Sequence, residues 1–407
     1  MDAKQSQRNI FAAAAAGCIG SSGFTLVMPF LPLYIAELGT TDLSEIAMWS
    51  GLTLAATPAV TAISAPLWGR VGDRYGSKVL VIRSLAAFIL TKAAMAFVTA
   101  PWQLLALRAL LGVFAGYGAL TISMAAESAP RHRMAHAIGV VQTGHRLGPA
   151  IGPVIGGALA PLVGLRNVFL AASVFYTAAL LLVIFLYREP REGRAPRALR
   201  GGREVFSQLL HLPGFVLALV LIFGLQTVDR SFGPVLPLFV SQLGVESARV
   251  PVVSGVLFSL AAVSAAFGAF LAGRLLLRFS ARRVIVVGSL AAALGMAAIG
   301  LAPSLWIVGA AMVVVGAAIG TATTTVWAVA GSLLPGDAHA TGFGLMTTAN
   351  LIGLAFSPFI AGFIGGSGLR IVFVADVILL LLLAFLVARR LRSDALRPPP
   401  DAPVPEP

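Results

Sequence analysis

The chain has 407 residues, of which 58% are hydrophobic and 11% are charged, whereas ordinary soluble domains carry about 25% charged residues. This composition excludes a typical water-soluble domain and indicates an integral membrane protein. The net charge of +13 could signal a nucleic-acid partner, but the placement of the basic residues argues against one. The single cysteine, Cys18, permits no internal disulfide and fits no metal-site spacing, so we expect no bound metal.

Long apolar segments recur along the chain, each close to the length of about 20 residues that crosses a bilayer as a helix. Strands of a membrane barrel would be about ten residues long and would alternate in polarity, unlike these segments rich in alanine, leucine and valine. We therefore predict an all-α membrane protein with twelve transmembrane helices. The predicted spans cover residues 9–35, 46–67, 79–99, 102–126, 135–160, 166–187, 212–240, 250–273, 284–301, 304–332, 341–364 and 370–388.

The lysines and arginines gather in the tails and in every second connection between the spans. This asymmetry is the positive-inside pattern, and it predicts an even number of spans with both termini in the cytoplasm. It also explains the net charge without nucleic acid. The basic clusters lie at residues 4–8, 70–83, 131–133, 188–203, 274–283 and 389–397.

The second half of the chain repeats the first at an offset of 204 or 205 residues. GLRNVF (164–169) aligns with GLRIVF (368–373), and PLYIAELG (32–39) aligns with PLFVSQLG (237–244). Two parallel six-helix repeats resemble the plan of the major facilitator superfamily, in which the substrate site lies between the halves near mid-membrane. The predicted parts are a six-helix bundle at 1–187, a basic cytoplasmic linker at 188–211, a second bundle at 212–392 and a disordered cytoplasmic tail at 393–407.

GRVGDRYGSK (69–78) lies between the second and third predicted spans. Its glycines suit a tight turn, and Asp73 can face a helix N-terminus or a basic partner. The segment resembles the superfamily signature G-x-x-x-D-R-x-G-x-K/R, which implies a cytoplasmic latch that favours the outward-facing state. Arg74 and Lys78 would then bind carbonyls or carboxylates of the other half. A plain basic turn is the alternative, although it does not explain the Gly–Asp–Gly spacing. The latch residues are Gly69, Asp73, Arg74, Gly76 and Lys78.

GPAIGPVIGG (148–157) resembles the fifth-helix signature G-x-x-x-G-P-x-x-G-G of the superfamily's antiporters. Glycines four residues apart let a neighbouring helix approach closely, and prolines remove hydrogen bonds and bend the helix. Generic packing of small residues is the alternative interpretation. The residues assigned to helix packing and bending are Gly148, Gly152, Pro153, Gly156 and Gly157.

Charged residues inside spans are rare and indicate function by default. Arg146, near the middle of the fifth span, is expected to face the interhelical cavity or an acid such as Asp229. Its neighbour His145 has an ordinary pKa of about 6.5 and could exchange protons, or it could form a hydrogen bond across a packed interface. Because adjacent helical residues point about 100° apart, we expect at most one of the two to face straight into the cavity.

The other charged residues in spans carry weaker predictions. Arg108 resembles the superfamily's fourth-helix R-x-x-x-G pattern, which implies a link to proton handling. A local pairing of Asp229 with Arg230 is as plausible as transport chemistry, and Lys92 and Glu127 lie nearer helix ends, where snorkelling or a solvated cap is expected. The candidate proton or substrate pathway comprises Arg108, His145, Arg146, Asp229, Arg230 and Asp376.

The amino-terminal part carries a closer resemblance, to the MdtG-type multidrug exporters of the drug:proton antiporter group. It rests on residues 21–39, 48–51, 64–76 and 107–112. The resemblance implies a monomeric secondary transporter of a bacterial-type inner membrane that exports small amphipathic compounds in exchange for protons, without a cofactor. A nutrient importer on the same fold is the main alternative. A membrane enzyme or sensor is a weaker one, because the five histidines are scattered.

Overall fold

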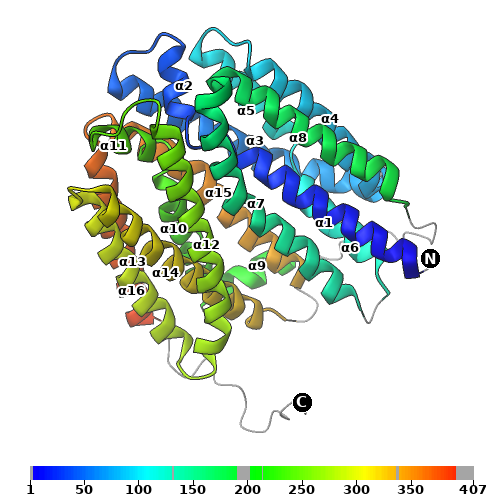
Figure 1. Cartoon of the computed structure of the whole chain (residues 1–407). Helices are drawn as coiled ribbons and strands as arrows, with labels where there is room; N and C mark the ends of the chain where they lie inside the picture. Colours follow the sequence, from blue (N-terminus) through cyan, green and yellow to red (C-terminus); the bar gives the residue numbers. More distant parts are fainter. Residues whose placement is uncertain (1–2, 131–132, 190–201, 213, 336–338, 391–407) are drawn as a thin grey trace.

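The computed structural model describes residues 3–130, 133–189, 202–212, 214–335 and 339–390, and these ranges contain helices and no β-strand. Figure 1 shows two helical bundles side by side, one from each half of the chain. The predicted tail at 393–407 and residues 190–201, which are half of the predicted linker, lie outside the described residues. The helices are α1 (Ala3–Thr25), α2 (Leu31–Glu37), α3 (Leu43–Tyr75), α4 (Ser77–Met95), α5 (Pro101–Val113), α6 (Tyr117–Ser128), α7 (Met134–Val163), α8 (Leu165–Leu186), α9 (Gly202–His211), α10 (Phe215–Ser231), α11 (Leu236–Gln242), α12 (Val250–Leu276), α13 (Ala281–Leu301), α14 (Leu305–Ser332), α15 (His339–Gly365) and α16 (Leu369–Arg390).

The described part of the chain contains ten helical segments that are long and apolar enough to cross a membrane. α1 and α4 bring the number of spans to the predicted twelve, and both pack inside the first bundle, against α6 and α8. α4 is less apolar because Lys78, Arg83 and Lys92 fall within its 19 residues. The all-α membrane fold predicted from the sequence is confirmed.

Three predicted spans are each split into two helices. α1 and α2 are separated around Pro29, and α10 and α11 around Pro234, because proline has no N–H with which to continue the helical hydrogen bonds. α5 and α6 meet at Gly116, whose φ of 102° is left-handed and favours glycine. The spans predicted at 9–35, 102–126 and 212–240 are therefore each interrupted by a short break.

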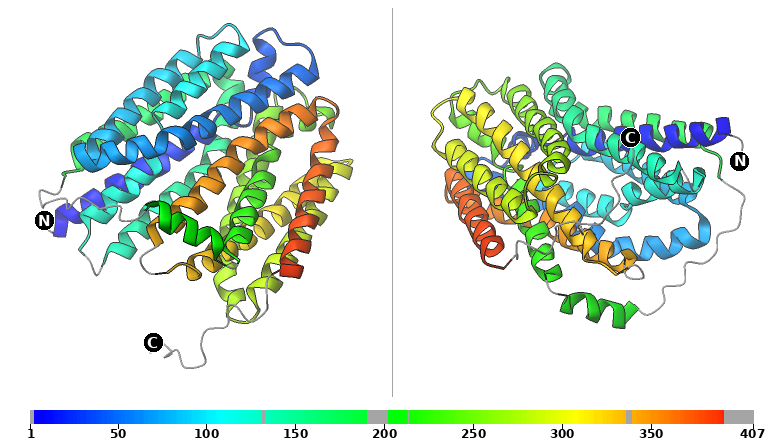
Figure 2. Two further views of the ribbon diagram at one scale, coloured as in Figure 1. Left: turned by 180° about the vertical axis from the view of Figure 1, so that it is seen from behind. Right: turned by 90° about the horizontal axis from the view of Figure 1, so that it is seen from below.

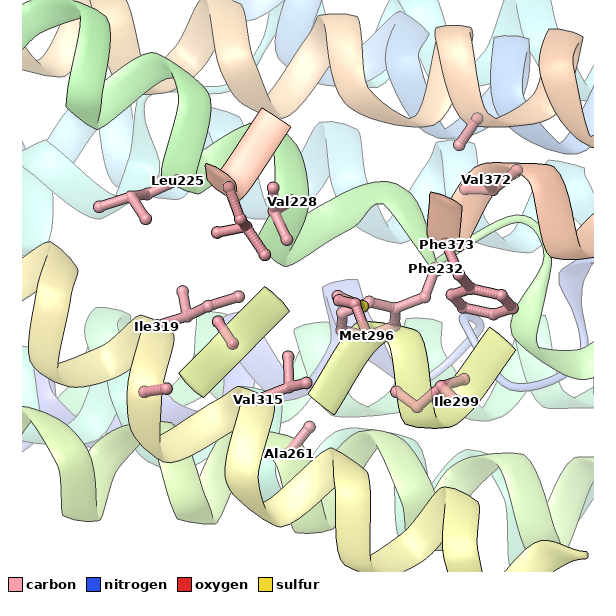
Figure 3. Close-up of a cluster of buried hydrophobic side chains, with 14 of the residues drawn as sticks. Leu225, Val228, Phe232, Ala261, Met296, Ile299, Val315, Ile319, Val372 and Phe373 are labelled. Carbon is pink, nitrogen blue, oxygen red and sulfur yellow. The ribbon is translucent and has the colours of Figure 1, made fainter. Parts of the chain in front are cut away.

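Each bundle has an apolar core of its own. Figure 3 shows part of the second core, in which α10, α12, α13, α14 and α16 contribute interlocking aliphatic and aromatic side chains. This second cluster also takes in Met28, Ile46 and Ala47 from the first half. The two bundles therefore share an apolar seam.

Two helix pairs related by the repeat form this seam: α3 packs on α15, and α7 packs on α12. A Cβ atom on Gly51 of α3 would overlap the Pro358 carbonyl, and one on Gly255 of α12 would overlap the Pro153 carbonyl. Glycine thus lets the backbones touch across the seam. These contacts lie in the parts of the helices nearer α2 and α11, which also contact each other. Away from this end the two bundles diverge (Figure 2).

Candidate functional site

A cavity of about 380 Å³ lies between the two bundles. Its wall is mostly apolar, with a few polar and charged groups from both halves, as is typical of small-molecule sites. The first half contributes α1, α3 and α7, and the second contributes α10, α12, α14 and α15. The lining residues are Phe24, Thr25, Met28, Leu54, Pro58, His145, Arg146, Pro149, Pro153, Gln226, Asp229, Arg230, Phe232, Gly233, Phe258, Ala261, Ala262, Ala265, Ala266, Ala269, Ile319, Gly320, Thr323, Thr324, Leu354 and Pro358.

His145 and Arg146 both line this cavity, although we expected at most one of them to face it directly. The His145 side chain is half-buried, and its Nε2 lies 2.8 Å from the hydroxyl of Thr121 on α6. It also packs beside Gly17 of α1 and at 6.1 Å from the Tyr117 ring. Arg146 is exposed. His145 therefore joins the cavity wall to α1 and α6, whereas Arg146 has no ion pair among the described residues.

Asp229 and Arg230 line the same cavity from α10. The Arg230 Nε lies 3.0 Å from the Asp229 carboxylate, and the two side chains are 30% and 29% exposed. Among the described residues, the ion pair of Asp229 is with this neighbour and not with Arg146. The local pairing, one of the two alternatives left open by the sequence, is present, and transport chemistry stays a prediction for this pair on the cavity wall.

Two cations are buried behind the cavity wall of the first bundle. Arg108 is 1% exposed, its Nε and Nη2 have no hydrogen-bond partner in the described structure, and its guanidinium lies 5.9 Å from the ring of the cavity residue Phe24. Lys92 is fully buried, with its Nζ unbonded and 5.9 Å from the Phe169 ring. The expectation that Lys92 snorkels is wrong, because α8 covers this face of α4.

Asp376 lies outside the central cavity. It is buried on α16 and accepts a hydrogen bond of 2.5 Å from the Ser231 hydroxyl at the end of α10. In this conformation the carboxyl group cannot touch a molecule in the cavity. Its partner Ser231 directly follows Asp229 and Arg230 on α10, so the hydrogen bond can hold the end of that helix in place.

A family model described as Major Facilitator Superfamily matches residues 13–350 and 232–407. The chain belongs to this superfamily. It is 36% identical over 273 residues to the multidrug resistance protein MdtG of Klebsiella pneumoniae (strain 342), which covers 67% of this chain and 66% of that protein. It is 34% identical over 284 residues to the multi-drug resistance efflux pump PmrA homolog of Lactococcus lactis subsp. lactis (strain IL1403), covering 69% of each.

A solved structure of a bacterial homolog of the human lysosomal transporter Spinster, in an inward-facing and occupied conformation, matches with a TM-score of 0.78. The match covers 94% of this chain and 96% of that chain at 19% identity. At this identity the match supports the fold and no statement about function. The superfamily and the subgroup predicted from the sequence motifs are confirmed.

The superfamily loop signature at 69–78 is mostly helical, because α3 continues to Tyr75 and the turn occurs at Gly76, with a φ of 98°. Lys78 donates to the carbonyls of Tyr187 at 2.7 Å and Ile184 at 3.3 Å, at the end of α8. These carbonyls belong to its own half, and a partner of Lys78 across the interface stays a prediction for the outward-facing state. Of the other latch residues, the side chains of Asp73 and Arg74 lie outside the described structure.

The glycines of the antiporter signature face two different neighbours. Added Cβ atoms on Gly148 and Gly152 would overlap atoms of α1, one on Gly156 would overlap Leu26 just after α1, and one on Gly157 would overlap the Pro251 carbonyl of α12. α7 therefore packs closely within its own bundle and across the seam at once.

Two polar residues of this region received no prediction from the sequence. Thr121 gave no signal, because hydroxyl residues are common in membrane helices. Gln226 lines the cavity and accepts a hydrogen bond of 2.8 Å from Asn350, a contact that depends on the packing of α10 against α15.

Proposed function

We propose that this chain is a proton-coupled exporter of small amphipathic compounds that works by alternating access. The observation that carries the proposal is the cavity between the two bundles, with titratable and charged groups on an otherwise apolar wall. The relatives named for multidrug resistance and efflux support export over import. The protein lies in a bacterial-type inner membrane as a monomer, with both termini in the cytoplasm.

With this orientation, the α2 and α11 end faces away from the cytoplasm. The seam contacts nearest that end support an inward-facing conformation. The outward-facing state forms when the cytoplasmic ends of the bundles meet, and the signature at the end of α3 then acts as the latch. Asp73 and Arg74 make contacts across the interface in that state.

Coupling in this proposal centres on His145. Its bond to Thr121 orients the imidazole, which exchanges a proton with the cavity as substrate arrives or leaves. Arg146 binds the polar group of the substrate, and Arg108, buried behind Phe24, tunes the proton affinity of the site. The pair of Asp229 and Arg230 opens to exchange partners during the cycle.

The charge balance of the cavity favours anionic or neutral substrates over cationic ones. Asp229 is compensated by Arg230, while Arg146 remains as a free positive charge. Arg108 and Lys92 add buried positive charge on the same side. An amphipathic compound with a carboxylate or a strong hydrogen-bond acceptor fits this wall, with its apolar part against Phe24, Phe232 and Phe258.

Proteoliposomes test this function. A pH gradient of either sign is imposed, and the movement of matched anionic, neutral and cationic amphipaths is followed. We expect substrate and protons to move in opposite directions, with the anionic or neutral compounds preferred. Movement in the same direction would establish the proton symport of a nutrient importer instead, and preference for cations would overturn the assigned substrate charge.

A further inference from the structure

A second cavity lies on the outer surface of the second bundle, between α12, α13 and α14. Its volume is about 610 Å³, and none of its lining residues lines the central cavity. Its wall is apolar, and Val287 and Val314 within it are 59% and 44% exposed. Because these helices cross the membrane, the groove opens to lipid.

One end of the groove carries a charge. Arg283, two residues into α13, is exposed and is the charged residue among the described lining residues. Its guanidinium lies 5.8 Å from the ring of Phe279, at the mouth of the groove. The groove continues along α13 to Ala291, eight residues further, which is about 12 Å of helix. A leaflet of hydrocarbon is about 15 Å deep, so the groove spans most of one leaflet.

The corresponding place in the first bundle is filled. There, Arg83 stacks on Trp68 with its guanidinium 3.4 Å from the ring centre, and its Nη2 donates to the Phe114 carbonyl at 3.2 Å. The Trp68 indole donates to the Val113 carbonyl, so both side chains also bond the backbone where α5 ends.

The offset of 204 residues between the halves explains the difference. At this offset Arg83, Trp68 and Phe114 become Val287, Ala272 and Ala318. Three large side chains are thus replaced by small ones, and Val287 and Ala318 line the groove. The groove is a consequence of sequence divergence between the repeats, and the opposite change, Val79 to Arg283, places a cation at its mouth.

We propose that this groove binds one acyl chain of an anionic phospholipid, with the lipid phosphate on Arg283. A hydrocarbon chain matches the apolar wall, and an exposed arginine at the membrane surface matches an anionic headgroup. The neighbouring Arg282 is already engaged by the Ala388 carbonyl of α16. Arg283 is therefore the cation placed to hold the phosphate.

Native mass spectrometry tests the headgroup contact. The full-length protein is mixed in detergent with phosphatidylglycerol or phosphatidylcholine, and the lipid retained after removal of the detergent is measured. We expect selective retention of one phosphatidylglycerol, reduced about fivefold in Arg283→Ala, the factor typical of one basic residue near an anionic surface. Arg278→Ala is the matched control, because Arg278 is exposed at the same membrane surface but does not line the groove. Equal losses in the two variants, or equal retention of the two lipids, would overturn the proposal.

Crosslinking tests the acyl chain separately from the headgroup. Phosphatidylglycerol with a photoreactive group in its chain should label the α13 and α14 residues of the groove, and Ala318→Phe, which refills the space, should abolish this labelling. Label distributed evenly over other lipid-facing residues such as Leu294 would overturn the assignment. Displacement of the label by a transported compound would assign the groove to substrate, and crosslinking between two copies of the chain would assign it to a dimer contact.

Discussion

Arg146 and Asp229 carry opposite charges on the cavity wall but come from different halves, and in the described structure no ion pair joins them. An uncompensated arginine within a membrane costs several kcal/mol by most estimates. The free charge is therefore retained at a cost, which favours a role in binding. The same reasoning applies to Lys92 and Arg108, whose polar atoms lack partners in this part of the protein.

Replacing Arg146 should uncouple substrate from protons. We expect Arg146→Ala to reduce substrate-driven proton release about tenfold or more, since a hydrogen bond to a charged group contributes about 1.5–3 kcal/mol. Arg146→Lys should retain part of the signal, because it keeps the charge but loses the planar fork. Proton release is measured with a pH dye on purified protein. Arg166→Ala, an exposed arginine at the start of α8, is the control, and unchanged release in both Arg146 variants would exclude the residue from coupling.

Replacing Lys92 should change stability in the opposite direction from replacing Lys78. Lys92→Met removes a buried side chain whose Nζ has no partner among the described residues, at similar volume, and should raise stability because burying an ion costs several kcal/mol of desolvation. Lys78→Met removes two hydrogen bonds to α8 carbonyls and should lower stability. Thermal unfolding in detergent measures both, and a fall in the midpoint for Lys92→Met would show that this lysine has a stabilising partner.

At the scale of elements, α7 is the helix that connects the most parts of the mechanism. One face contacts α1 through Gly148 and Gly152 and Leu26, just after α1, through Gly156, and another contacts α12 through Gly157. The same helix carries His145 and Arg146 into the cavity. A movement of α7 against α12 therefore changes the seam and the charged wall together.

A bulky residue on the seam face should shift the conformational equilibrium. In Gly157→Leu the side chain meets the backbone of α12, and overpacking of this kind costs about 1–3 kcal/mol. We expect the α2 and α11 end to open and transport to fall. Gly139→Leu on the same helix is the control, since the space around Gly139 is open. Spin labels at Glu37 and Gln242, both exposed, should be further apart in Gly157→Leu than in the unmodified protein, and their distance should not change in Gly139→Leu. Identical distances in all three proteins would mean that the seam does not set the conformation.

At the scale of the whole molecule, the two halves share one arrangement of helices but differ in the residues of the loop signature. Lys78 bonds the end of α8, and its counterpart Arg282 bonds the end of α16 in the same way. The latch acid has no counterpart, because Leu277 takes the place of Asp73. In the proposed mechanism, alternating access therefore depends on one latch, in the first half.

Removing the latch acid should affect the whole cycle. We expect Asp73→Asn to reduce transport in proteoliposomes about tenfold or more while the protein still inserts, because a charge-assisted contact of about 1.5–3 kcal/mol is lost in the outward-facing state. Glu246→Gln, which removes an exposed acid paired with Arg249 near α11, should transport normally. Wild-type transport by a well-expressed Asp73→Asn variant would contradict the latch role.

The sequence by itself determined the all-α membrane fold, the duplication, the superfamily and the identity of most charged residues in the spans. These properties depend on apolar length, on the repeat offset and on motif spacing, all of which can be read from the linear sequence. Apolar length did not reveal the helix breaks at Pro29, Gly116 and Pro234, because it does not depend on backbone conformation.

The tertiary structure decided where each side chain points. The rotation of a helix within a bundle depends on its neighbours, so the sequence could not pair Asp229 with Arg230, place Asp376 against Ser231 or bury Lys92 under α8. The groove on α13 likewise exists because residues from three helices are small at one place in space. Such coincidences between distant segments are created by packing, and packing is the information that a linear pattern lacks.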